Sequence, residues 1–107
     1  MNSFSTMSVS DRQLKLIKEA AELLVMEHRL TTDDAVLVIS SALKKELSAR
    51  QTTFEKLESG SKIDRTSFIR SVVKHVQISL ENNPYWRSHN LDKSIENFYQ
   101  VLHKQWD

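Results

Sequence analysis

The chain has one glycine and one proline in 107 residues, and this scarcity restricts its fold more than any other feature. β-Sandwiches and β-barrels need repeated tight turns, which depend on glycine and proline. Along most of the chain, apolar residues recur every three or four positions, the period of an amphipathic helix. The sequence therefore predicts an all-α fold, a compact antiparallel bundle of four to five helices joined by short loops.

The N-terminal part divides into a tail and a first pair of helices. Residues 1–9 are rich in serine and carry no helical stripe, so we expect a disordered or loosely docked tail before a single helical domain at 10–107. Ser10 and Gln13 fit a capping box that starts the first helix, which should end near His28. Residues 31–34 supply a hydroxyl cap and two acids for a second helix, which should run to about residue 48.

The middle of the chain leaves two alternatives open. Residues 49–61 either form a short helix carrying Phe54 and Leu57, or continue the second helix. After them, Ile63 and Asp64 fit a hydrophobic staple and N-cap for the next helix.

The last two helices are bounded by the 82–84 segment and by Asn90. The residue before proline avoids the α conformation, so one helix should end at 82–84. Asn90 can cap the last helix, which has the cleanest stripe in the chain. The positions of this stripe are Leu91, Ile95, Phe98, Leu102 and Trp106.

The first helix carries two adjacent apolar rows. One row is Leu14, Ile17, Ala21, Leu24 and Val25, and the other is Leu16, Ala20 and Leu23. Together they cover an arc of roughly 200°, more than one neighbouring helix can bury. One possibility is that a partner or a second copy covers Leu16 and Leu23. The other is that the helix lies inside the monomer, between the last helix and the helix that begins near Asp64 and carries Phe68, here called the Phe68 helix.

A second candidate contact lies at the junction before the last helix. Tyr85, Trp86 and Arg87 are adjacent, and these residue types are enriched in binding hot spots. The competing interpretation is that Tyr85 and Trp86 fold over the end of the bundle.

The sequence lacks the groupings that most catalytic and metal sites need. There is no cysteine, which excludes disulfides, thiolate metal sites and a cysteine nucleophile. Gly60 stands alone, which excludes a P-loop and a dinucleotide-binding loop. No histidine has a histidine four residues away, or a glutamate three residues away, as helical metal sites require. We therefore expect no cofactor, no metal and no enzymatic activity.

Charge offers limited support for nucleic-acid binding. Fifteen basic and 14 acidic residues give a net charge of +1, so no global field attracts nucleic acid or an anionic membrane. A helix-turn-helix reading of the first two helices is opposed by Asp33 and Asp34, which would face the phosphates. The alternative nucleic-acid surface is Arg65, Arg70 and Lys74 on the Phe68 helix.

These observations favour a small non-catalytic regulatory or adaptor protein that acts through protein–protein interaction, alone or as a homodimer. The expected contact residues are Leu16, Leu23, Tyr85, Trp86 and Arg87. The alternative is a small helical DNA-binding regulator. With neither a signal peptide nor a long apolar run in the sequence, we expect a cytoplasmic protein that does not bind membranes.

Overall fold

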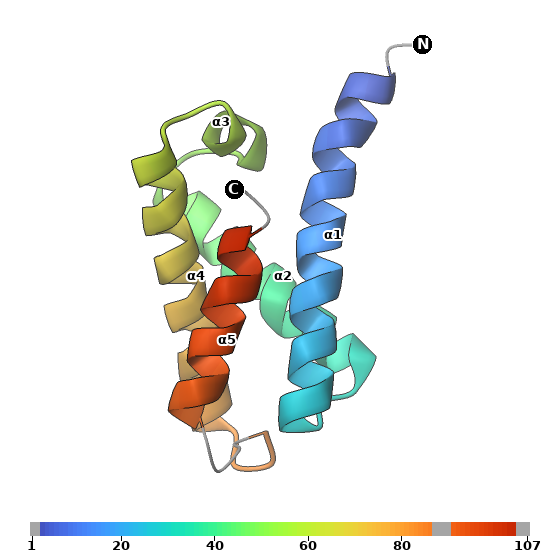
Figure 1. Ribbon diagram of the computed structural model, residues 1–107, viewed down its shortest axis with the longest axis vertical. Helices are drawn as coiled ribbons and strands as arrows, with labels where there is room; N and C mark the ends of the chain where they lie inside the picture. Colours follow the sequence, from blue (N-terminus) through green and yellow to red (C-terminus); the bar gives the residue numbers. More distant parts are fainter. Residues whose placement is uncertain (1–2, 87–90, 105–107) are drawn as a thin grey trace.

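The computed structural model describes the backbone of residues 3–86 and 91–104, and the side chains of residues 11–86 and 91–104. Within these ranges it contains helices and no strand, which confirms the all-α prediction. The helices are α1 (Ser3–His28), α2 (Thr32–Ala49), α3 (Phe54–Glu58), α4 (Lys62–Asn82) and α5 (Leu91–Lys104). The four long helices alternate in direction, and the short α3 lies at one end of the bundle (Figure 1).

The long helices form a ring around the core. α1 packs against α2 and α5, and α4 packs against the same two helices from the other side. α3 contacts α1 and α4 and closes one end. The largest fully buried side chains are Leu16, Leu24, Ile39, Leu43, Phe68, Ile69, Val72, Val76, Leu80, Phe98 and Leu102. Every long helix thus contributes to one apolar core, and its burial is the main stabilising contribution.

Hydroxyl caps begin two of the helices, and the first of them confirms the start predicted at residues 31–34. The Thr31 hydroxyl accepts a hydrogen bond from the backbone N–H of Asp34 at 3.1 Å and begins α2. The Thr53 hydroxyl accepts one from the N–H of Lys56 at 3.2 Å and begins α3. The second cap decides the open question in the middle of the chain, because residues 54–58 form a separate short helix.

Two other predicted starts are wrong. α1 begins at Ser3 rather than at Ser10, since no glycine or proline precedes Ser10 to stop the helix. α4 is capped by Ser61, whose hydroxyl accepts from the Asp64 N–H at 3.1 Å. Ile63 is 80% exposed and forms no staple. A hydroxyl three residues before Asp64 satisfies the free N–H groups directly and moves the start upstream.

Two helices end in a left-handed residue that is not glycine. Arg29, after α1, has a φ of 60°, and Gln51, after α2, has a φ of 52°. These side chains carry the steric cost that glycine would avoid, which explains how a chain with one glycine can still turn sharply. α4 ends at Asn82, as the nearby Pro84 predicts. The predicted cap Asn90 and the stripe residue Trp106 lie outside the described residues.

Candidate functional site

An apolar groove runs along α1 and the first turns of α2. Its volume is about 550 Å³. The lining side chains are Leu14, Ile17, Lys18, Ala21, Glu22, Val25 and Met26 of α1, with Thr32 and Val36 of α2. We call this surface the α1–α2 groove. It is apolar along its length, with Lys18 and Glu22 as its charged side chains.

The groove exists because α1 is apolar over more of its circumference than its neighbours cover. Leu16, Ala20 and Leu24, spaced by four residues, face the core and are fully buried. α2 and α5 flank this buried stripe, and in Figure 1 α1 stands at the edge of the bundle. Leu14 therefore remains 62% exposed and Met26 80% exposed.

The predicted interaction row on α1 is thereby corrected. Leu16 is fully buried in the monomer and is therefore not a free contact residue, whereas Leu23 is partly buried against the core and stays a prediction. The competing interpretation correctly places a helix on each of two sides of α1. It names α4 and α5 as these helices, whereas α1 packs against α2 and α5. Leu14, on the first of the two apolar rows, is exposed instead.

The aromatic junction divides between surface and core. Tyr85 is 89% exposed, and its backbone N–H donates to the side-chain oxygen of Asn83 at 3.1 Å. Trp86 packs against the core and completes a turn in which its N–H donates to the Asn83 carbonyl at 3.0 Å. Trp86 thus covers the end of the bundle while Tyr85 does not, and Arg87 lies outside the described residues.

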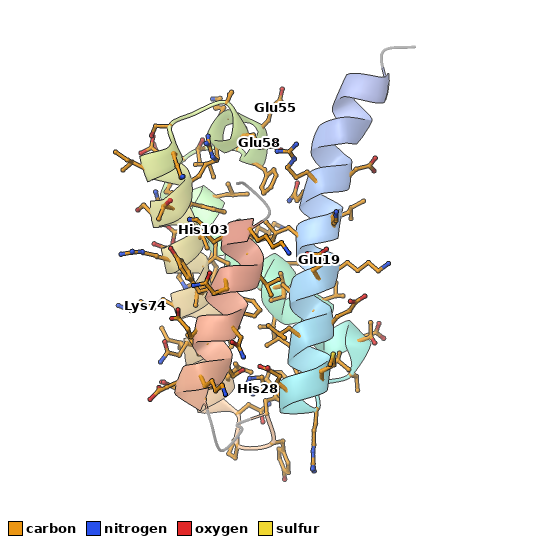
Figure 2. The ribbon with its side chains drawn as sticks, in the orientation of Figure 1. Glu19, His28, Glu55, Glu58, Lys74 and His103 are labelled. Carbon is orange, nitrogen blue, oxygen red and sulfur yellow. The ribbon has the colours of Figure 1, made fainter. Side chains whose placement is uncertain are left out.

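The basic residues of α4 are not equivalent. The Arg65 guanidinium donates to the Gly60 carbonyl at 2.7 Å and to the Glu58 carbonyl at 3.3 Å, and so caps the end of α3. The Arg70 guanidinium lies over the Tyr99 ring at 5.9 Å. Lys74 is exposed and points away from the bundle (Figure 2). Of the three, only Lys74 makes no contact of these kinds with the residues that the structure describes.

A hollow of about 610 Å³ lies beside two basic side chains of α4. Its lining residues are Lys62, Ile63, Thr66, Ser67, Arg70 and Ser71. Cations and hydroxyl groups are the donors that phosphate groups prefer. The nucleic-acid alternative therefore retains Arg70, and Lys62 is better placed for it than Arg65.

A partly buried polar cluster joins the end of α1 to α5. Nδ1 of His28 donates to the Trp86 carbonyl at 2.7 Å, and Nε2 of His28 lies 2.5 Å from Oγ of Ser94. The Ser94 hydroxyl donates to Oε2 of Glu27 at 2.6 Å, and Asn97 donates to Oε1 of Glu27 at 3.4 Å. Figure 2 shows His28 at the last turn of α1, beside the start of α5. We call these groups the His28 cluster.

The His28 cluster brings together a serine, a histidine and a carboxylate, but not in the order that hydrolysis uses. In a serine hydrolase the carboxylate binds Nδ1 of the histidine, whereas here a backbone carbonyl occupies that position and the carboxylate binds the serine. His28 and Ser94 are both buried, so a substrate cannot reach the hydroxyl. The arrangement holds α1, α5 and the 83–86 turn together.

A second polar cluster joins α2 to α4 at Glu46. Its Oε2 accepts from Nε of Arg50 at 2.6 Å, and its Oε1 accepts from Nε2 of His75 at 3.1 Å. Arg50 also donates to Ser67 at 3.0 Å and to Ser71 at 3.3 Å. Burial raises the pKa of Glu46, but the hydrogen bonds and charges of Arg50 and His75 outweigh it, so this pKa lies below its ordinary value.

We expect the Glu46 carboxylate to stabilise the fold at neutral pH and to lose this effect in acid. Because its pKa is lower in the folded than in the unfolded chain, the contribution is complete above about pH 4.5, the ordinary value. It disappears as the pH falls through the folded-state pKa. Glu46→Gln should lower the free energy of unfolding at neutral pH. In urea titrations, the difference in this free energy between the wild type and the variant should become smaller as the pH falls. A constant difference would contradict this, and Glu96→Gln, at an exposed position of α5, is the control.

The described residues contain no group of three or more histidine, aspartate or glutamate side chains placed to hold an ion. Among the same residues, no helix combines the length and apolarity needed to cross a bilayer. No family model, curated protein or solved structure matches the chain in the comparisons made.

Proposed function

We propose that the chain is a small non-catalytic regulatory or adaptor protein that binds another protein, or a second copy of itself, through the α1–α2 groove. The observation that carries this proposal is the exposure of large apolar side chains along one continuous groove, with Leu14 at one end and Met26 at the other. Contiguous exposed apolar surface on a globular protein commonly marks an interface.

The shape of the groove indicates the kind of contact. It follows the axis of α1, and its walls come from two helices that pack side by side. An amphipathic helix can lay its apolar face into such a groove, with anchors at helical spacing. Lys18 and Glu22 are exposed beside the apolar floor, so they can select and orient the incoming helix.

The alternative, a small helical DNA-binding regulator, is supported by one observation. The hollow on α4 presents Lys62 and Arg70 with three hydroxyl groups, which are those of Thr66, Ser67 and Ser71. Two points make it the second choice. The net charge is +1, which gives little long-range attraction to phosphates, and Arg65 is held at the end of α3.

Affinity capture from the native host, with and without nuclease, tests the proposal. Leu14→Glu and Met26→Glu place a charge in the groove at exposed positions, so both variants should fold and lose the protein that the wild type retains. Ile63→Glu is the matched control, because Ile63 on α4 is as exposed as Met26.

Three outcomes decide between the candidates. A protein retained by the wild type and by Ile63→Glu, but lost by both groove variants, supports the groove. If Leu14→Glu retains the same protein as the wild type, the groove proposal is refuted. Retention that nuclease abolishes, and that Arg70→Glu also abolishes, favours the DNA-binding alternative.

A further inference from the structure

We propose that the occupant of the α1–α2 groove is a second copy of this chain, with the two α1 helices antiparallel about a twofold axis near residue 20. This inference rests on the proposed function and names the partner. It is carried by the order of charged and apolar side chains on the exposed side of α1, and by the groove beside them.

Two pairs of exposed charges, three of them on α1 and the fourth at Arg29 directly after it, are complementary to themselves when the helix is reversed. Counted outward from residue 20, Lys18 and Glu22 lie at equal distances, and so do Asp11 and Arg29. All four are exposed, and each pair combines one positive with one negative charge. An antiparallel second copy therefore places Glu22 beside Lys18 and Arg29 beside Asp11, and the twofold axis repeats both pairs.

The same charges argue against a parallel arrangement. Parallel helices in register would bring Lys18 beside Lys18 of the second copy and Glu22 beside Glu22. Like charges in contact repel and select against that alignment. The Lys18 and Glu22 charges therefore favour an antiparallel second copy over a parallel one.

The two most exposed apolar side chains of the groove follow the same symmetry. Leu14 and Met26 lie at equal distances from residue 20, one at each end of the groove. Leu14 of the second copy would therefore enter the end of the groove formed by Val25, Met26 and Val36. Ala21 lines the groove near its centre, and its small side chain lets the two helices approach closely.

The two kinds of contact have different roles. Burial of Leu14 and Met26 supplies most of the affinity, because exposed ion pairs contribute little. The charge pairs fix the direction and the register. Lys18 and Glu22 are also four residues apart on one helix and can attract each other within a single chain. A useful test must therefore separate attraction within a chain from attraction between chains.

A charge-exchange experiment makes this separation. In sedimentation equilibrium, the wild type should show a concentration-dependent monomer–dimer equilibrium. Lys18→Glu should weaken the dimer by roughly tenfold or more, because two attractive pairs become repulsive, and Glu22→Lys should do the same. An equimolar mixture of the two variants should form a heterodimer, since two acidic groups then face two basic groups.

The double variant K18E/E22K should dimerise like the wild type, because exchanging both charges preserves the complementarity. Circular dichroism should show the same helicity for every variant. A wild type that stays monomeric at all concentrations would overturn the inference. The inference would also be overturned if Lys18→Glu and Glu22→Lys each dimerised as tightly as the wild type. It would be overturned as well if mixing these two variants did not restore association.

Failure of this inference differs from failure of the proposed function. If the chain is monomeric but Leu14→Glu loses a captured protein that Ile63→Glu retains, the groove binds a different protein and only the self-association is wrong. If the chain is monomeric and Leu14→Glu captures the same protein as the wild type, both proposals are wrong.

Discussion

Leu102→Ala is expected to lower the free energy of unfolding by about 2–5 kcal/mol, the range for removing a buried leucine side chain from a core. Leu102 is fully buried on α5, and α5 packs against both α1 and α4. The cavity left by alanine would face two other helices, which cannot both move inward to fill it.

Urea denaturation with a matched control measures this effect. Leu37→Ala makes the same chemical change on α2 at a leucine that is 64% exposed, and it should cost less than about 0.5 kcal/mol. A loss for Leu102→Ala as small as that of the control would mean that α5 does not pack on the core as described.

The burial of Leu102 could be predicted from the sequence because α5 has a single narrow stripe. Phe98 and Leu102 lie four residues apart on one face of the helix, and both are buried. The neighbouring positions Leu91 and Ile95 pack against the core only in part. Where one face of a helix is apolar, periodicity alone shows which side turns inward.

The same reasoning fails on α1, where two apolar rows compete. Periodicity shows that α1 is helical and widely apolar, but the buried row depends on where α2 and α5 contact it. The buried stripe takes Leu16 and Ala20 from one row and Leu24 from the other, while Leu14, on the same row as Leu24, stays exposed. This choice is a property of tertiary packing, so the candidate groove could not be located from the sequence although its cause, the wide apolar arc, could.

Helix starts could likewise be predicted from capping residues only where no other residue nearby offered a different start. Thr31 and Thr53 are hydroxyl caps with a free N–H three residues later, and both were predictable. Near α4, Ser61 and Asp64 both fit a cap, and the upstream hydroxyl takes the position. At Ser10, a favourable cap sequence does not start a helix because the preceding residues are already helical.

The His28 cluster left no signal in the sequence at all. Glu27 and His28 are separated from Ser94 by 67 and 66 residues, and no spacing rule links residues at such distances. A lone histidine near the end of a helix is usually a capping or surface residue, so His28 was not predicted to be buried. Its role follows only from the fold, which brings the end of α1 to the start of α5.

His28→Ala is the second change for which we expect a large effect, a loss of about 2–4 kcal/mol of unfolding free energy. The substitution removes the donor to the Trp86 carbonyl and the partner of the Ser94 hydroxyl, and each buried polar group left unpaired costs about 1–3 kcal/mol.

Ser94→Ala should also destabilise the fold, because it removes the link between His28 and Glu27. If these groups act as one network, the double variant should lose at least about 0.5 kcal/mol less than the sum of the two single losses in urea denaturation. Strict additivity would mean that His28 stabilises the fold by packing alone. The cluster would then not be the connection that joins α1 to α5 at the end of the bundle where Trp86 packs.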